Sequence, residues 1–159
     1  MWQAQIFTLY PEFFPGPLSK GLYGKALEKK IWNLKVVNIR DAADDKHKTV
    51  DDTPFGGGAG MLLKADILAK SIDRNLKDRS RIFYLSPKGK KFDQKFAREL
   101  SKEKSINLIC GHFEGVDERL LSTRNIEEIS IGDFVLSGGE SAAFVIIDSI
   151  LRLLPGVLG

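Results

Sequence analysis

Short apolar runs alternate with longer amphipathic stretches along the chain. The apolar runs are rich in Ile, Val and Phe with polar flanks, which predicts strands over residues 5–9, 35–39, 81–85, 106–110 and 127–131. Apolar residues at helical spacing predict helices over 18–29, 65–75, 93–102 and 140–154. On the last of these, one face carries Ala143, Ile146, Ile147, Ile150 and Leu154. Strands that alternate with helices predict an α/β fold with a parallel sheet flanked by helices.

Three turns directly follow expected strands, at residues 85–89, 111–117 and 132–139, and each contains glycine. Ligands of open α/β sheets usually bind at the carboxyl ends of the strands, in such loops. The three turns are therefore expected to line one crevice. Residues 40–61 are predicted to be irregular, first densely charged and then glycine-rich.

Composition narrows the class without naming an activity. The 159 residues suit one domain, and 43% hydrophobic and 28% charged residues are ordinary values for a globular protein. The net charge of +3 permits a nucleic-acid partner without requiring one. Cys110 is the only cysteine, the start lacks a signal-peptide pattern, and no apolar run approaches the roughly 20 residues of a membrane span. These features predict a cytoplasmic protein with no membrane partner.

The glycine-rich and charged segments each have two interpretations. Residues 55–61 hold four glycines in five positions, yet no Gly-Lys-Ser/Thr follows, so they are not a P-loop. They are either a flexible surface loop or a loop whose amides face a nucleotide. The charged run before them is either a solvated face or a contact to RNA phosphates through Arg40, Lys46 and Lys48.

The two later turns also leave alternatives open. Glu114, between two glycines, is either an exposed acid or a partner for an amino group or a metal-bound water. His112 is expected at the surface rather than as a ligand, because no second histidine stands at metal spacing, and Cys110 is expected in the core. No metal site is therefore predicted from these residues. The loop over 130–140 either reads an adenine edge through its backbone or only connects a strand to a helix.

The order and spacing of these motifs resemble the bacterial tRNA (guanine-N1)-methyltransferases, the TrmD family. The matching segments are residues 49–58, 84–87, 110–119, 130–140 and 155–159. The resemblance runs from Phe7 to the last residue, and five long motifs in one order make it highly specific.

The resemblance implies a SPOUT-class fold whose C-terminal half forms a deep trefoil knot, which general rules on chain topology do not predict. It implies one S-adenosylmethionine-binding methyltransferase domain over residues 1–159 and a homodimer with active sites at the subunit interface. The implied reaction moves a methyl group from S-adenosylmethionine to N1 of the guanosine 3′-adjacent to the tRNA anticodon, with tRNA as partner and a magnesium ion in catalysis.

Carried over to this sequence, the resemblance also implies site residues. Asp51, Gly57 and Gly58 would face the target base, and Arg152 matches the family's catalytic arginine. Glu114 would contact the methionine amino group or the magnesium ion. The cofactor would lie between three sets of residues: Tyr84, Leu85, Ser86 and Pro87; Gly111, Phe113, Glu114 and Gly115; and Ser130, Ile131, Gly132, Asp133, Phe134, Val135, Leu136, Gly138 and Gly139.

Some positions depart from the family pattern. Phe55, Phe113 and Phe134 stand where tyrosine is common, and Ala59 stands where proline is common. The family's catalytic aspartate and its helical tRNA-binding domain would follow Gly159 and are absent from this sequence. The 159 residues are therefore expected to bind the cofactor with little methyl transfer.

Two other functions fit the same motifs. One is a non-catalytic nucleotide-binding or RNA-binding α/β module, and the other is a SPOUT methyltransferase for a different RNA position. Preference for S-adenosylmethionine over ATP distinguishes the first, and mapping of the methylated nucleotide distinguishes the second.

Overall fold

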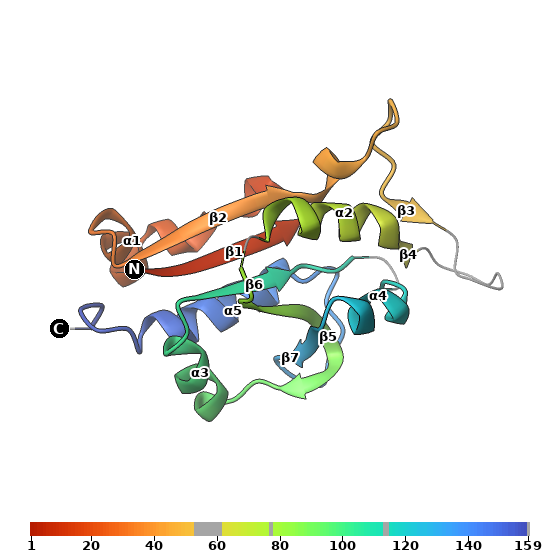
Figure 1. Ribbon diagram of the computed structural model, residues 1–159. Helices are drawn as coiled ribbons and strands as arrows, with labels where there is room; N and C mark the ends of the chain where they lie inside the picture. Colours follow the sequence, from red (N-terminus) through yellow and green to blue (C-terminus); the bar gives the residue numbers. More distant parts are fainter. Residues whose placement is uncertain (53–61, 77, 113–114, 159) are drawn as a thin grey trace.

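A computed structural model describes residues 1–52, 62–76, 78–112 and 115–158. Its centre is a five-stranded sheet in the order β2-β1-β6-β5-β7, in which every pair of neighbours is parallel (Figure 1). The strands are β1 (Trp2–Thr8), β2 (Trp32–Asn38), β5 (Arg81–Lys91), β6 (Ser105–Ile109) and β7 (Ile126–Ser130). The prediction of a parallel α/β sheet is confirmed.

Helices connect these strands. They are α1 (Gly21–Glu28), α2 (Ala65–Asn75), α3 (Gln94–Ser101), α4 (Glu118–Thr123) and α5 (Glu140–Leu151). Short 3₁₀ helices cover Pro11–Phe13, Gly16–Ser19 and Ile39–Ala42, and a small antiparallel pair joins β3 (Asp51–Asp52) to β4 (Leu62–Leu63). In Figure 1, α2 lies in front of the sheet and α5 behind it.

The sheet separates two hydrophobic cores, as expected when helices cover both faces of a parallel sheet. One core packs α1, α3 and α5 against the sheet and contains Trp32, Phe83 and Ile147. The other packs α2 and α4 against it and contains Phe7 and Leu68. The predicted face of α5 is confirmed, because all five of its apolar residues are buried. Cys110 is buried as predicted.

Two predicted elements need correction, and one helix was not predicted. The residues taken as a turn after a strand, 85–89, lie inside β5, which continues to Lys91 after an irregularity between Leu85 and Lys90. Pro87 and Gly89 suggested a turn, but the strand resumes because Lys90 and Lys91 pair with β7. The expected helix over 18–29 is a 3₁₀ turn followed by α1, and α4 was not predicted.

No helix among the described residues is long and apolar enough to cross a membrane.

Candidate functional site

A pocket of about 220 Å³ lies where the carboxyl ends of the central strands meet the start of α5. Segments from β5, from the loop after β6 and from the loop after β7 line it. The described lining residues are Tyr84, Leu85, Ser86, Pro87, Gly111, His112, Gly115, Ile129, Ser130, Ile131, Gly132, Phe134, Val135, Leu136, Ser137, Gly138, Gly139 and Ala142. The three segments chosen from the sequence therefore do share one crevice, although the first of them lies in β5 and is not a turn.

The first wall of the pocket comes from the irregular part of β5. Leu85 and Lys90 both pair with Ile129 of β7, so the residues between them bulge out of the ladder. This bulge brings Ser86 and Pro87 to the pocket.

Tyr84 of the same wall is buried, and burial raises the pKa of its phenol to about 12, with smaller contributions from Glu128 and Cys110. The phenol therefore stays protonated near neutral pH, where it can donate a hydrogen bond but cannot serve as a base.

The second wall follows β6. The Gly139 amide donates to the Gly111 carbonyl over 3.0 Å, which joins this wall to the start of α5. Cys110, directly before Gly111, is fully buried, and burial together with the nearby Glu140 raises the pKa of its thiol well above the usual value. The thiol is therefore a poor nucleophile, in keeping with a packing role.

The placement of His112 differs from the prediction. Its side chain is only 14% exposed, and its Nε2 atom shares a hydrogen bond of 2.6 Å with Oε1 of Glu140. The prediction of a surface residue was wrong because Glu140 lies 28 positions away in sequence and reaches His112 only in the folded sheet.

The third wall is the loop from β7 to α5. The Ser130 hydroxyl donates to the Gly132 carbonyl over 2.9 Å and so closes the first turn of this loop. Phe134 and Val135 are 50% and 87% exposed although both line the pocket, so this wall presents apolar side chains to the outside. Asp133 does not line the pocket.

Four other predicted site residues lie outside the described residues: Phe113, Glu114, Gly57 and Gly58. Asp51 lies in the small β3–β4 pair, where the Leu63 amide donates to the Gly115 carbonyl over 2.8 Å. Because Gly115 lines the pocket, this bond connects the β3–β4 pair to the second wall.

Arg152 is exposed at the carboxyl end of α5, while the pocket lies at the amino end. At about 1.5 Å of rise per residue, Arg152 is about 18 Å along the helix axis from Glu140. The structure therefore does not bring Arg152 to the pocket of its own chain.

Sequence reasoning assigned no role to Thr8 or Glu140. Glu140 is 2% exposed and Thr8 is fully buried, and the Thr8 hydroxyl donates to Glu140 Oε2 over 2.7 Å. One signal was available for Glu140, a carboxylate at the first position of a mostly apolar helix. No pattern pointed to Thr8, because its partner is 132 positions away.

Metal-binding groups are not evident in the part of the chain that the structure describes. Within it, no three His, Cys, Asp or Glu side chains lie close enough to hold an ion. Glu114 stands outside that part, so its predicted contact with magnesium stays a prediction.

A parallel sheet with glycine-bearing loops around a pocket at its carboxyl edge defines an α/β ligand-binding protein. Comparison with known proteins narrows this class. The sequence model of tRNA (Guanine-1)-methyltransferase TrmD matches residues 2–159. The tRNA (guanine-N(1)-)-methyltransferase of Pelagibacter ubique (strain HTCC1062) is 84% identical over all 159 residues, which correspond to 70% of that protein.

More distant relatives carry the same name. The proteins of Bartonella tribocorum and of Wolbachia pipientis are 57% and 52% identical over 99% of this chain, and the match covers 68% of each. The chain belongs to the tRNA (guanine-1)-methyltransferase family, TrmD.

Proposed function

We propose that the pocket binds S-adenosylmethionine and that the protein methylates N1 of the guanosine 3′-adjacent to the tRNA anticodon. The observation that carries the proposal is the pocket itself. The described residues that the family resemblance implies for cofactor binding, Asp133 excepted, line this one cavity although they come from three separate segments.

The chemistry of the lining fits this cofactor better than a nucleoside triphosphate. The described lining residues include no Lys or Arg, and their ionisable side chains are those of Tyr84 and His112. A polyphosphate would find no cationic side chain among them, whereas an adenosine joined to a cationic sulfonium needs none. Leu85, Ile131 and Phe134 offer apolar contacts for the base, and the glycine-bearing loops offer backbone groups for its edge.

When bound, S-adenosylmethionine supplies an electrophilic methyl group. The guanine N1 atom carries a proton, so a base near N1 and a donor near O6 are required. We assign the O6 contact to Arg152, because a guanidinium stays charged and presents fixed donors. The family resemblance implies an aspartate as this base.

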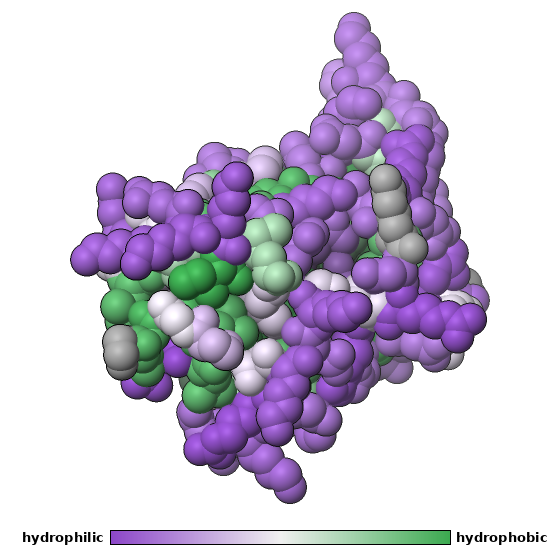
Figure 2. Space-filling model, turned by 60° about the vertical axis from the view of Figure 1, so that its left-hand side comes forward, coloured by the Kyte–Doolittle hydropathy of each residue, from purple (hydrophilic) through white to green (hydrophobic). Residues whose placement is uncertain are grey.

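The position of Arg152 supports a homodimer whose active sites lie at the subunit interface. Since Arg152 and the pocket occupy opposite ends of α5, Arg152 of one subunit would serve the pocket of its partner. Exposed apolar surface is available for such an interface. Figure 2 shows a patch of hydrophobic residues bordered by hydrophilic residues. The large exposed hydrophobic residues are Met1, Phe13, Leu22, Phe134, Val135, Leu136, Val145 and Leu158.

Asp51 and the glycines at 57 and 58 are proposed to face the target base. The bond between Leu63 and Gly115 supports this arrangement, because it ties the β3–β4 pair that flanks the glycine-rich segment to the wall of the pocket. The guanosine would leave its stack to reach the methyl group, at a cost of a few kcal/mol. The trefoil knot and the magnesium ion remain predictions from the resemblance, and the cytoplasmic location remains a prediction from composition.

A calorimetric titration of the 159-residue chain tests cofactor binding. We expect S-adenosylmethionine to bind at up to one site per subunit and ATP to bind at least about 100-fold more weakly, since the described lining residues include no cationic side chain to meet its phosphates. Equal affinities for the two would favour a general nucleotide-binding module.

Mixed dimers test the role of Arg152. The chain is extended with the remainder of the Pelagibacter ubique relative. R152A subunits are then mixed with G139A subunits at a concentration of S-adenosylmethionine too low to occupy the weakened G139A pocket. If each pocket uses the partner's Arg152, random mixing restores about one quarter of the wild-type rate, since about half of the dimers are mixed and each has one intact site.

If Arg152 served its own pocket, the mixture would stay inactive. In R152A alone, methyl transfer should fall about 100-fold or more while cofactor affinity changes little. Equal losses of both would contradict the assigned role.

Mapping the methylated nucleotide on tRNA distinguishes the proposed product from that of an enzyme for another RNA position.

A further inference from the structure

A buried carboxyl group fastens three segments of the chain beside the pocket. Glu140 receives the Thr8 hydroxyl on Oε2 at 2.7 Å and shares a hydrogen bond with His112 on Oε1 at 2.6 Å. The Thr8 hydroxyl also accepts the Tyr10 amide at 3.0 Å. The end of β1, the loop after β6 and the start of α5 therefore meet at one side chain.

Glu140 is exceptional in its burial. Among the described residues it is the only Asp, Glu, Lys or Arg that is buried. Burying a carboxyl group lowers the free energy of unfolding unless hydrogen bonds satisfy its oxygens. Truncating one hydrogen-bond partner therefore leaves a buried oxygen unsatisfied. Its position at the first turn of α5 also favours a negative charge there, because the helix amides point toward it.

The network touches the pocket directly. His112 lines the pocket, and its ring packs against Tyr10 with 4.9 Å between ring centroids. A Cβ atom built on Gly138 would overlap the His112 ring, so the ring lies directly on the backbone of the third wall. The bond between Gly139 and Gly111 lies beside these contacts. The Glu140 network thus holds the second and third walls against each other.

We propose that Thr8, His112 and Glu140 are positioning residues for the methyl donor, setting the spacing between the loops after β6 and β7 that bind it. This inference rests on the proposed function. The hydrogen bonds of the network need not involve the reacting atoms. They act on the ligand by fixing the positions of His112, Gly138 and Gly139.

A purely structural role for the network is the competing explanation, and a second hydroxyl that donates to a carboxylate of the same helix, α5, separates the two. The Tyr23 hydroxyl donates to Asp148 over 2.6 Å, near the carboxyl end of α5 and away from the pocket. Y23F and T8V each delete one hydroxyl bonded to a carboxylate of α5. T8S restores the Thr8 hydroxyl.

The experiment measures the dissociation constant for S-adenosylmethionine by calorimetry and the thermal midpoint without ligand for each variant of the 159-residue chain. We expect T8V to weaken binding at least about tenfold, T8S to bind within about threefold of wild type, and Y23F to bind like wild type while its midpoint falls. If T8V does not fold, H112F is measured in its place, because phenylalanine keeps a ring beside Tyr10 and removes the hydrogen bond to Glu140.

The outcomes are distinguishable. If T8V or H112F lowers the midpoint while affinity stays at the wild-type value, the network is structural and the positioning proposal is overturned, with the proposed function intact. If the wild-type chain fails to bind S-adenosylmethionine, the proposed function and the positioning proposal both fail.

Discussion

Gly139 occupies one of the most confined backbone positions beside the pocket. A Cβ atom at this residue would lie 2.8 Å from the Cα atom of Cys110 and 3.0 Å from the amide nitrogen of Gly111. Both neighbours are backbone atoms of the second wall, so they cannot rotate away as a side chain could. Glycine is therefore required here by close approach of two loops and not by an unusual φ angle.

G139A is expected to push these two walls apart. We expect its affinity for S-adenosylmethionine to fall at least about tenfold and its thermal midpoint to drop, because overpacking of this kind typically costs about 1–3 kcal/mol. Calorimetry and thermal unfolding measure the two effects, and S141A, at an exposed position two residues further on, is the control. Wild-type affinity in G139A would show that the spacing of these loops does not govern binding.

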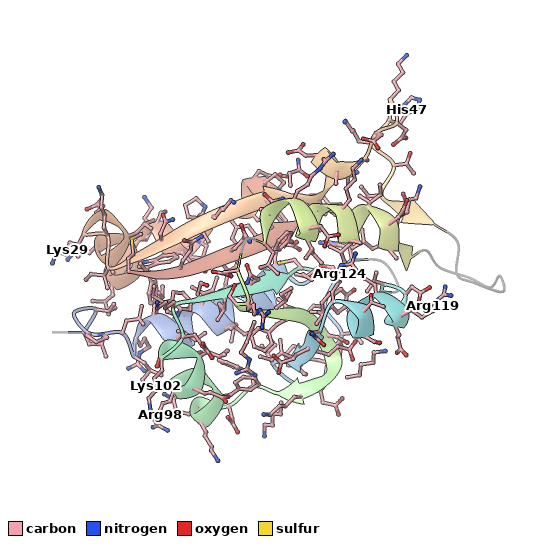
Figure 3. The ribbon with its side chains drawn as sticks, in the orientation of Figure 1. Lys29, His47, Arg98, Lys102, Arg119 and Arg124 are labelled. Carbon is pink, nitrogen blue, oxygen red and sulfur yellow. The ribbon has the colours of Figure 1, made fainter. Side chains whose placement is uncertain are left out.

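The sequence predicted the positions of some residues at the pocket and not of others. Gly138 and Gly139 were predicted at the pocket because a glycine pair between a strand and a helix is an unusual local pattern. His112 was misplaced and Thr8 was missed, because both depend on Glu140, which is distant from them in sequence. Figure 3 shows Lys29, Arg98 and Lys102 at the periphery of the ribbon.

At the scale of elements, the short helix α4 shows how local bonds define a boundary. The Asp117 carboxylate accepts the Arg119 amide over 2.9 Å and lies 2.6 Å from Nη2 of the same arginine. These bonds to Arg119 lower the pKa of Asp117 to about 2. Asp117 follows the pocket residue Gly115 by two positions, so the cap also helps to fix the end of the second wall.

Asp117 is expected to titrate near pH 2, well below the value of about 3.9 for a free aspartate. Because the folded pKa is the lower one, the cap contributes fully above about pH 4 and is lost as the pH falls toward 2. An NMR titration of the side-chain carboxyl carbon measures the midpoint. In R119A the midpoint should move up toward about 3.9, and a wild-type midpoint near that value would rule out the cap.

Elements with strong periodicity were predicted closely, and the others were not. The bounds of α2 agree with the prediction at both ends, since its apolar face spans 11 residues. The six residues of α4 are too few to show a period. The second half of β5 contains Pro87 and Gly89, so local propensity opposed a strand that pairing with β7 nevertheless stabilises.

At the scale of the whole molecule, one sheet serves two cores. Ile147 of α5 and Leu68 of α2 are both fully buried, but they pack on opposite faces of the same strands. If either core is disrupted, the strands of the sheet lose their side-chain packing on one face. The two faces are therefore expected to unfold together.

I147A and L68A should each lower the free energy of unfolding by about 2–5 kcal/mol while a single transition is retained. L22A, at a position 45% exposed, is the matched control and should cost less than L68A. Chemical denaturation followed by tryptophan fluorescence and by circular dichroism measures the midpoints, with Trp2 and Trp32 both buried. Different midpoints from the two signals would mean that the faces unfold separately.

The sequence by itself determined the α/β class, the parallel sheet, the buried face of α5 and the loops that line the pocket. These follow from periodicity, glycine placement and family motifs, all of which are local or ordered along the chain. Only the tertiary structure decided that β5 bulges and resumes and that Thr8, His112 and Glu140 meet. The physical reason is that these features depend on pairing and burial between residues far apart in sequence, whose energies no local pattern records.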